Sequence, residues 1–231
     1  MKVYRSQDIR KVKTDKRDSI SIANYGIDKW FNLRRFDAQE DIYAELKLLG
    51  RQYRFFMESR IEHLLNLTHL LDYTMPGVKS CFGGWSETSG KDKLCDFVEE
   101  YWHYDNITKR SESKFVEHYQ KWAKKKGYHQ SESKAIQIYR LAREGIPTIP
   151  SNTPSTKMLL LEAVKALREV NGALFAILTR MQELARGLPE YPVVRAMGGV
   201  GDVLSVKLIA EIGDVRRFHS SKALIAFAGI D

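Results

Sequence analysis

The sequence predicts a mainly α-helical protein, and three features indicate this fold class. Two segments, residues 42–71 and 160–181, repeat apolar residues at the alternating spacing of three and four that is typical of coiled-coil-like helices. A glycine-rich turn separates two further helical patterns within residues 192–209. Proline and glycine, which end helices, fall between these segments. The 231 residues suffice for one large or two small domains with a substantial core.

The first predicted helix begins near Thr14. A threonine hydroxyl suits an N-cap, and Asp15 then lies where the helix dipole favours an anion. Asp15 and Asp18 are three residues apart, so their carboxylates project from one side of the helix. An apolar face for burial is formed by Ile20, Ala23 and Ile27.

Two carboxylates on one helical face can hold Mg²⁺, which prefers oxygen ligands and completes its shell with water and phosphate. The surrounding cations, Lys13, Lys16 and Arg17, suit a phosphate backbone. A common alternative is a capped, solvated helix start whose acids offset nearby lysines. Spacing alone leaves both interpretations open.

A long helix should follow over roughly thirty residues, or about 45 Å at about 1.5 Å per residue. The heptad phase of its apolar stripe is expected to shift by one residue at Met57. The helix should end at Met75-Pro76-Gly77. The stripe comprises Ile42, Leu46, Leu49, Tyr53 and Phe56, and then Met57, Ile61, Leu64 and Leu71.

Residues 83–90 read as a loop, residues 94–102 as a short amphipathic helix, and residues 108–145 as two helices divided near Gly127. The aromatic residues of the short helix, Phe97, Tyr101 and Trp102, are expected in the core rather than in a base-stacking platform, because they bury much apolar area. Lys124-Lys125-Lys126 is interpreted as a solvated helix end, with a phosphate contact as the alternative.

A proline-rich linker at residues 146–155 precedes the second long helix. Its heptad seam contains one polar member, Asn171, which can fix register at some cost in stability. This helix pairs either with residues 40–72 of the same chain or with another copy. The seam consists of Leu160, Val164, Leu167, Asn171, Leu174, Leu178 and Met181.

Residues 188–209 have a helix-hairpin-helix pattern, with a turn at Gly199, Val200 and Gly201 followed by Leu204, Leu208 and Ile209 at helical spacing. Glycines accept positive φ and leave backbone N–H groups open to a phosphate, and the next helix points its dipole at that anion. The pattern therefore indicates nucleic-acid binding through Gly199, Val200 and Gly201. A plain helical hairpin is the alternative.

Composition narrows the function classes. Residues 1–36 hold ten Lys and Arg against four Asp, so they carry +6 of the net charge of +8. This asymmetry fits a polyanionic partner, although solubility alone would also account for it. No apolar run of membrane-spanning length and no signal peptide appears, which predicts a cytoplasmic protein. Cys81 and Cys95 lack metal or disulfide spacing, and the histidines lack zinc spacing, so neither zinc nor disulfides are expected.

Two blocks resemble one family. The run from Lys13 to Ala23, KTDKRDSISIA, is similar to the K-T-D-x-x-D-A-x-x-I-A motif of the DEDD transposases of insertion-sequence family one-ten, relatives of Piv-type DNA invertases. Ser19 replaces the family's alanine. The run from Met197 to Asp231 resembles its second domain, P-G-I-G, L-A-E-I-G-D, R-F and L-A-x-Y-A-G-L, with Gly198 in place of proline. Residues 54–76 also resemble its long helix.

The resemblance implies DNA transposition or site-specific recombination with Mg²⁺ at a DEDD site, to which Asp15 and Asp18 contribute. It implies DNA and an element-encoded guide RNA as partners, and a homo-oligomer. The expected domains are a remnant of an RNase H-like domain at residues 1–29, a helical region at residues 30–187, and part of a helix-hairpin-helix transposase domain at residues 188–231.

Because the family's first Asp, its Glu and its serine nucleophile have no counterpart in these residues, we expect a copy shortened at both ends and inactive alone. A competing hypothesis is a non-catalytic nucleic-acid-binding or oligomerising helical protein. A decayed gene piece without function is a third.

Overall fold

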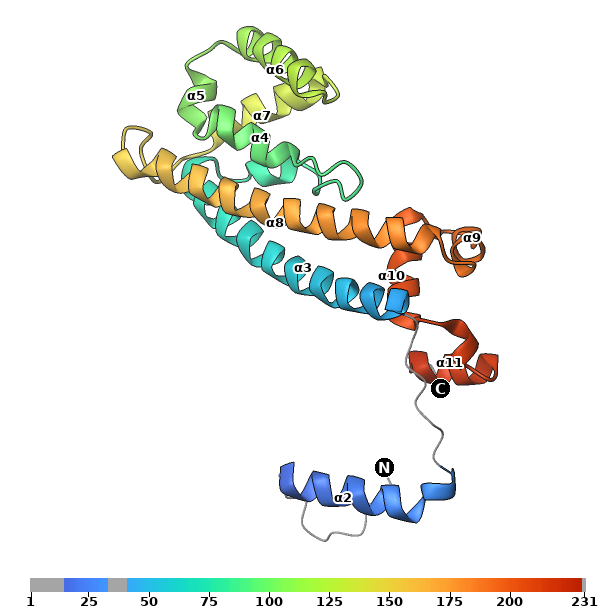
Figure 1. Ribbon diagram of the computed structural model, residues 1–231. Coiled ribbons are helices and arrows are strands. Elements are labelled where there is room, and N and C mark those ends of the chain that lie inside the picture. The colour runs from blue at the N-terminus through green and yellow to red at the C-terminus, as the bar shows by residue number, and fades with distance from the viewer. Residues whose placement is uncertain (1–14, 33–40, 230–231) are drawn as a thin grey trace. The chain divides into compact units, whose positions relative to one another are not determined.

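The computed structural model describes residues 15–32 and 41–229 (Figure 1). The chain divides into two compact units, residues 1–39 and residues 40–231, and each is described by itself. The described residues fold into α-helices and short 3-10 helices, with no strand among them. The prediction of a mainly α protein is therefore confirmed for these residues.

In the first unit, helix α2 (Asp15–Asp28) is followed by the 3-10 turn η1 (Trp30–Asn32). The helix forms where the sequence predicts it, while its expected N-cap, Thr14, lies outside the described residues. The expected apolar face is present but uncovered within this unit. Ile27 is 75% exposed and Phe31 is 99% exposed.

The second unit is built on two long helices, α3 (Asp41–Thr74) and α8 (Pro154–Arg186), which pack along each other (Figure 1). Of the two pairings that the sequence allows, the structure shows the one within the chain. Every member of the predicted α8 seam, from Leu160 to Met181, is buried. Gly77, which follows the predicted stop of α3, has a φ of 78° that favours glycine.

One residue of the predicted α3 stripe, Ile61, is wrong, whereas Met57, Leu64 and Leu71 do pack in the core. Ile61, which was assigned to the stripe, is 52% exposed, whereas Arg60 is only 8% exposed. The buried stripe therefore continues from Met57 through Arg60 to Leu64 and Leu71, with a charged residue in the middle. Arg60 is tolerated there because Asn171 of α8 and Asp92 hydrogen-bond or pair with it.

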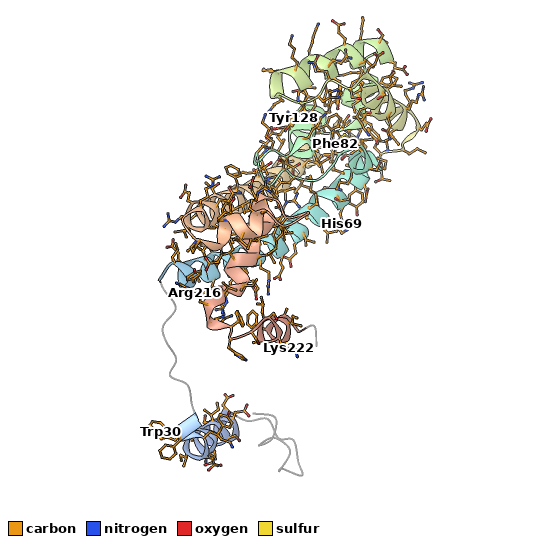
Figure 2. All side chains as sticks on the ribbon, turned by 90° about the vertical axis from the view of Figure 1, so that its right-hand side faces the viewer. Trp30, His69, Phe82, Tyr128, Arg216 and Lys222 are labelled. Atoms are coloured by element: carbon orange, nitrogen blue, oxygen red, sulfur yellow. The ribbon has the colours of Figure 1, made fainter. Side chains whose placement is uncertain are left out.

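A group of short helices packs on one end of the α3–α8 pair: η2 (Val78–Cys81), α4 (Lys93–Tyr101), α5 (Tyr104–Thr108), α6 (Glu112–Lys126) and α7 (Glu132–Glu144) (Figure 1). We call helices α4 to α7 the helical cap. Its division at Gly127 is as predicted; the short α5 was not predicted. In Figure 2, Phe82 and Tyr128 lie within this part of the molecule.

The helical cap is held by an aromatic core. Phe97, Tyr101, Phe115, Tyr119 and Trp122 are buried, and their rings contact one another at centroid distances of 4.7–6.4 Å. Tilted and edge-to-face ring pairs of this kind add stability beyond the area they bury. The prediction that the aromatic residues of the short helix belong to the core is confirmed for Phe97 and Tyr101.

The hydrophobic core has two parts that meet at the polar position of the seam. One contains Leu67, Leu71, Leu160 and Leu167 together with the aromatic residues of the cap. The other contains Leu46, Leu174 and Leu178 together with residues of the C-terminal helices. Arg60 and Asn171 lie between them along their respective helices.

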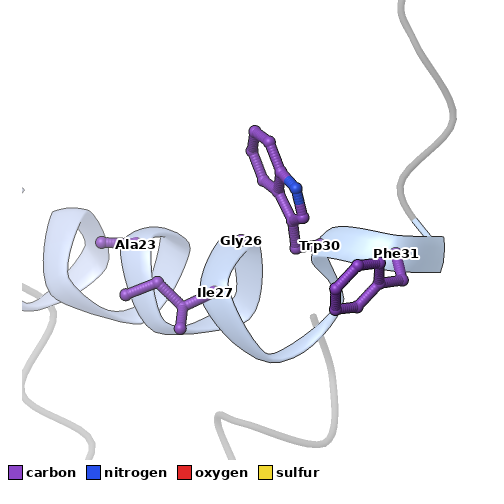
Figure 3. A pocket seen from close by; sticks show the side chains of 5 residues that line it. All are labelled: Ala23, Gly26, Ile27, Trp30 and Phe31. Carbon is purple, nitrogen blue, oxygen red and sulfur yellow. The ribbon is translucent and has the colours of Figure 1, made fainter.

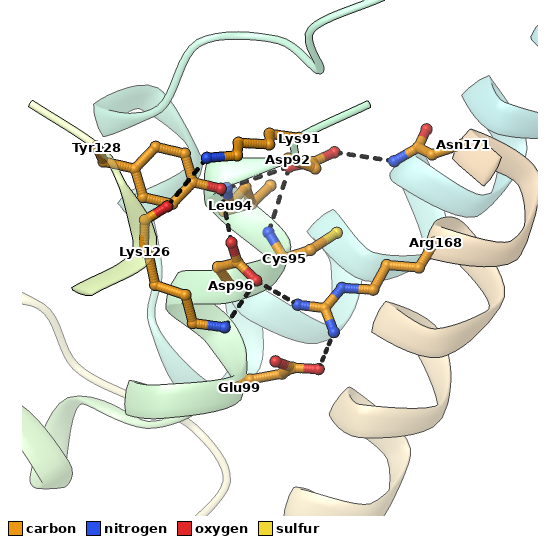
Figure 4. Close-up of polar contacts among 10 residues, drawn as sticks. All are labelled: Lys91, Asp92, Leu94, Cys95, Asp96, Glu99, Lys126, Tyr128, Arg168 and Asn171. Atoms are coloured by element: carbon orange, nitrogen blue, oxygen red, sulfur yellow. Dashed lines mark hydrogen bonds and ion pairs between the residues drawn. The ribbon is translucent and has the colours of Figure 1, made fainter. Parts of the chain in front are cut away.

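Asp92 joins α4 to Asn171 of α8 (Figure 4), and it also pairs with Arg60 of α3. Its carboxylate accepts hydrogen bonds from the backbone N–H groups of Leu94 and Cys95, and from the amide of Asn171 at 3.3 Å. One turn further on, Arg168 of α8 binds Asp96 and Glu99 of α4. These contacts fix the helical cap to α8.

The proline-rich linker is tied down. The carbonyl of Tyr73, at the end of α3, accepts hydrogen bonds from the N–H groups of Thr148 and Ile149, and the ring of His103 contacts the carbonyl of Ile149 at 3.0 Å. Pro154 occupies the start of α8, where its missing N–H costs nothing. The linker therefore connects the cap to α8 within one unit.

After α8 come α9 (Glu190–Arg195), α10 (Asp202–Ile212), η3 (Val215–Arg217) and α11 (Ser221–Ala228). Helix α10 packs on α3 and α8, where Gly50 allows close approach: a Cβ at Gly50 would lie 3.3 Å from the Cβ of Ala210. The predicted face of α10 is partly wrong. Leu204 is 45% exposed, while Val206 and Ile209 are buried.

Candidate nucleic-acid and metal-binding residues

The predicted acidic pair lies in the first turn of α2. Asp15 is exposed and Asp18 is half-buried, and residues three apart on a helix are surface neighbours. The hydroxyl of Ser19 donates to the backbone carbonyl of Asp15 at 2.7 Å, so this side chain is engaged with the helix itself. Both carboxylates are thus presented from one side of a helix start.

Of the cations predicted around this pair, only Lys16 can be placed, and it is exposed. Lys13 lies outside the described residues. Arg17 belongs to α2, but its side chain lies outside what the structure describes. Lys16 alone is therefore shown beside Asp15 and Asp18 on the helix.

The carboxylates of Asp15 and Asp18 fit part of a Mg²⁺ coordination shell. Two carboxylates supply hard oxygen ligands, and this ion commonly takes only one or two of them from the protein. Across the part of the chain that the structure describes, His, Cys, Asp and Glu side chains form no group of three that could hold a metal ion. Asp15 and Asp18 thus fit as a partial shell that water and phosphate would complete.

Next to the acidic pair, α2 carries a shallow apolar hollow (Figure 3). It is lined by Ala23, Gly26, Ile27, Trp30 and Phe31. Trp30 is 70% exposed. No charged side chain lines this hollow, so it has no means of orienting a polar ligand.

The second predicted site, the glycine turn, connects α9 to α10. Gly199 has a φ of 81°, a conformation that glycine adopts without strain, and the N–H of Val200 donates to the carbonyl of Met197 at 3.1 Å. A Cβ at Gly199 or Gly201 would meet nothing within 4 Å. Open space beside the backbone at the start of a helix is what an approaching phosphate requires.

An ion pair that the sequence analysis missed closes this turn. The guanidinium of Arg195, the last residue of α9, donates through Nε to Asp202 at 2.5 Å and through Nη1 to the carbonyl of Val200 at 3.0 Å. Tyr191 donates to the same carboxylate at 3.3 Å. The sequence signal that could have predicted this ion pair is an arginine and an aspartate seven residues apart, one on each side of the glycines.

The pair also sets the charge of the turn. The hydrogen bond from Arg195 lowers the pKa of Asp202, and the same bond raises the pKa of Arg195. Both residues are therefore charged at neutral pH, and Arg195 balances the carboxylate at the start of α10. The turn is electrically neutral, so its attraction for an anion comes from the free N–H groups and the helix dipole.

Helix α9 is anchored to the long helices by a buried tyrosine. The hydroxyl of Tyr43 in α3 donates to Glu190 at 3.0 Å. Burial, followed by the contact with Glu190, raises the pKa of Tyr43 to about 12, so it remains a hydrogen-bond donor at physiological pH. The position of the turn is thus set by α3 as well as by α10.

The two cysteines belong to neither predicted site. Cys81 of η2 and Cys95 of α4 are free and buried, and burial raises the pKa of each thiol. The expectation that neither forms a disulfide is confirmed for this pair. Within the described ranges, no helix has both the length and the apolar character needed to cross a bilayer.

Comparison with known proteins links the two predicted sites to one class. A family model described as a transposase, of the DEDD type, matches residues 1–76, which include Asp15 and Asp18. A second model, described as the transposase IS116/IS110/IS902 family, matches residues 191–231, which include the glycine turn. Neither match covers residues 77–190. No curated protein and no solved structure matches the chain.

Both matches place the chain among the transposases. Within that class it belongs to the IS110-type family of insertion-sequence transposases. The resemblance inferred from the two sequence blocks is thereby confirmed. The roles of Asp15, Asp18 and the glycine turn remain predictions.

Proposed function

We propose that this chain acts on DNA in transposition or site-specific recombination, as a DNA-binding member of the transposase family. The observation that carries the proposal is the coincidence of two independent family matches with the two candidate sites. One match covers the acidic pair and the other covers the glycine turn, although the two segments lie at opposite ends of the sequence.

In this proposal the glycine turn binds a DNA phosphate. The space where a Cβ would lie at Gly199 and Gly201 is open, which leaves room for a phosphate beside the start of α10, and Arg195 offsets the charge of Asp202 that would otherwise repel it. The contact is to the backbone, so it positions the protein and reads no bases.

Asp15 and Asp18 would hold Mg²⁺, with Lys16 and its neighbours Lys13 and Arg17 attracting the DNA. The ion, when bound, supplies Lewis-acid stabilisation of charge on phosphate oxygens. Two carboxylates alone cannot position the ligands on both sides of a scissile phosphate. We therefore propose that the chain by itself binds DNA without cutting it.

The family also suggests an RNA partner and self-association. The α8 seam that predicted self-association is covered by α3 of the same chain. A homo-oligomer formed through the long helices would therefore use their outer faces, where Leu48, Phe55 and Leu65 of α3 are exposed.

A binding assay with one matched control tests the role of the turn. Gly201→Leu places a bulky side chain where the phosphate should lie, at a φ that any residue can adopt, and should weaken binding to duplex DNA about tenfold or more. Gly84→Leu, also in open space but outside the turn, should leave affinity unchanged. Equal affinity for the two variants would contradict the role of the turn.

A nicking assay tests the role of the acids. Supercoiled plasmid incubated with the chain and Mg²⁺ should stay intact, for the wild type and for Asp15→Asn alike. Nicking by the wild type that disappears in Asp15→Asn would overturn the proposal that the chain alone does not cut. Binding of Mg²⁺, followed by NMR at Asp15 and Asp18, should be weak and lost in the variant.

A further inference from the structure

The charge of the second unit is unevenly distributed along the sequence. Residues 104–145, which comprise α5 to α7, contain ten Lys and Arg against five Asp and Glu, a net charge of +5. Residues 37–103 contain seven Lys and Arg against twelve Asp and Glu, a net charge of −5. A second basic region therefore exists besides the N-terminal one, and it lies in the part that neither family model covers.

Most cations of this region lack a carboxylate partner. Among the described lysines and arginines of residues 104–145, only Lys121 and Lys126 form ion pairs, with Glu117 and Asp96, while the Nε2 of His118 lies 3.8 Å from Glu100. By contrast, the arginines at the α8 contacts are paired, as Arg168 is with Asp96 and Glu99 and Arg180 is with Glu45. A cation without a carboxylate partner can bind an external anion without breaking an ion pair of the fold.

Four cationic or titratable residues of α6 share one face. Positions 114, 118, 121 and 125 follow the spacing of four, three and four residues that keeps side chains in line. Lys114, Lys121 and Lys125 are exposed, and His118 is half-buried. This row is about 16 Å long at about 1.5 Å per residue, which is long enough to contact more than one phosphate of a DNA backbone.

The segment after α5 extends this row. Lys109 donates to the side-chain oxygen of Asn106 at 3.1 Å, and Arg110 donates to the backbone carbonyl of Asn106 at 2.7 Å. Neither forms an ion pair. We call Lys109, Arg110, Lys114, His118, Lys121 and Lys125 the cap cationic face.

The pKa of His118 reflects the electrostatic potential on this side of α6. Its Nδ1 lies 2.7 Å from the hydroxyl of Tyr101, and its Nε2 lies 3.8 Å from Glu100. Burial, followed by the charge of Arg110, lowers the pKa of His118; Lys109 and Lys121 act in the same direction, and Glu100 opposes them. Cations of α5 and α6 therefore converge on this ring in spite of the nearby carboxylate.

The face is suited to a duplex rather than to unpaired bases. The aromatic residues of α6, Phe115, Tyr119 and Trp122, lie on a neighbouring face of the helix and are buried, so they leave no exposed ring on which a base could stack. A row of lysines without stacking partners binds a phosphate backbone without reading sequence.

We propose that the cap cationic face binds the phosphate backbone of double-stranded DNA, as a contact separate from the glycine turn. This inference rests on the proposed function, because a chain that binds no DNA would have no use for the contact. The face adds affinity and leaves sequence choice to other parts of the protein.

The test compares two double variants that remove the same charge. Lys114→Gln with Lys125→Gln removes two exposed, unpaired cations of the face. Arg51→Gln with Lys165→Gln removes two exposed, unpaired cations of the long helices. Exposed substitutions of this kind change stability little, and thermal unfolding of both variants should match the wild type.

Affinity for a duplex of random sequence is then measured from 50 to 300 mM salt. The face variant should bind at least tenfold more weakly at 0.15 M salt, and its salt slope should fall by about 1.8, or about 0.9 for each lost phosphate contact. The control variant should keep the slope of the wild type. If the wild type binds DNA but the two variants have equal salt slopes, this inference is overturned, while the proposed function is unaffected.

Two further readouts complete the test. Added duplex DNA should raise the pKa of His118 in an NMR titration, because phosphates offset the surrounding cations, while the ring resonances of His69 on α3 should stay unchanged. A pKa of His118 that does not change on adding DNA would contradict the contact.

Binding of duplex RNA with the same affinity and the same salt slope would overturn the assignment to DNA. A wild type that binds no DNA would refute the proposed function itself.

Discussion

Asn171, in the middle of α8, accepts a hydrogen bond at 2.8 Å from the Nε of Arg60 in α3. Both side chains are buried, and the amide of Asn171 donates in turn to Asp92, which lies 3.6 Å from the guanidinium. One polar position on each long helix therefore meets the other where the two halves of the core join. A slide of one long helix along the other by a turn would separate Arg60 from Asn171 and leave both buried groups short of a partner.

The first prediction concerns this contact. Asn171→Leu should lower the free energy of unfolding by about 1–3 kcal/mol, because buried Arg60 loses its acceptor. Urea unfolding measures the change, with Asn66→Leu on the exposed side of α3 as the control. Adding Arg60→Leu to Asn171→Leu should recover part of the loss, since an apolar pair replaces a broken polar one. A single variant as stable as the wild type would show that the amide is dispensable.

The second prediction compares two helix caps. Asp92 caps α4 and also pairs with Arg60, whereas Ser131 caps α7 through one bond to the N–H of Lys134. Ser131→Ala should cost about 1 kcal/mol, the usual value for a lost cap. Asp92→Ala should cost about 3 kcal/mol, because it also leaves a buried guanidinium without its carboxylate. Equal losses in urea unfolding would mean that Asp92 acts only as a cap.

The third prediction compares two glycines that follow helices. A Cβ at Gly145, after α7, would lie 2.6 Å from the ring of Tyr104 and 2.8 Å from the backbone carbonyl of Leu141. Gly145→Ala should therefore destabilise by about 1–3 kcal/mol through overpacking. At Gly187, after α8, the nearest atom is 3.6 Å away, and Gly187→Ala should be neutral or stabilise by up to about 1 kcal/mol. Thermal unfolding distinguishes them; a harmless Gly145→Ala would contradict the packing.

The fourth prediction concerns pH. Because Arg195 lowers the pKa of Asp202 in the folded state, this carboxylate contributes stability above its unfolded pKa of about 3.9 and loses that contribution as the pH falls through its lowered value. At pH 6 the unfolding temperature of the wild type should therefore be higher than that of Asp202→Asn. This difference in unfolding temperature should shrink toward pH 2. Asp72→Asn, at an exposed position of α3 without an ion pair, should show no such convergence. A difference that is constant with pH would rule out the ion pair.

Local patterns determined much of this protein. The heptad spacing of Leu160, Val164 and Leu167 sufficed to predict α8 and its buried face, because a helix of that length needs an apolar stripe. Gly77 and Gly127 marked helix ends, since each adopts a positive φ there. The two motif blocks sufficed to predict the family before any match was known, because short motifs retain the residues that the chemistry needs.

Only the tertiary structure decided the partners. No spacing rule could place charged Arg60 in the stripe instead of Ile61, because its burial depends on Asn171 and Asp92, which are 111 and 32 residues away in sequence. The same holds for α8, whose seam would suit a second copy equally well until α3 is seen to cover it. Arg195 and Asp202 pair because a turn folds one helix end onto the next helix start. Periodicity reports which face of a helix is apolar; what that face meets is settled when distant segments pack together.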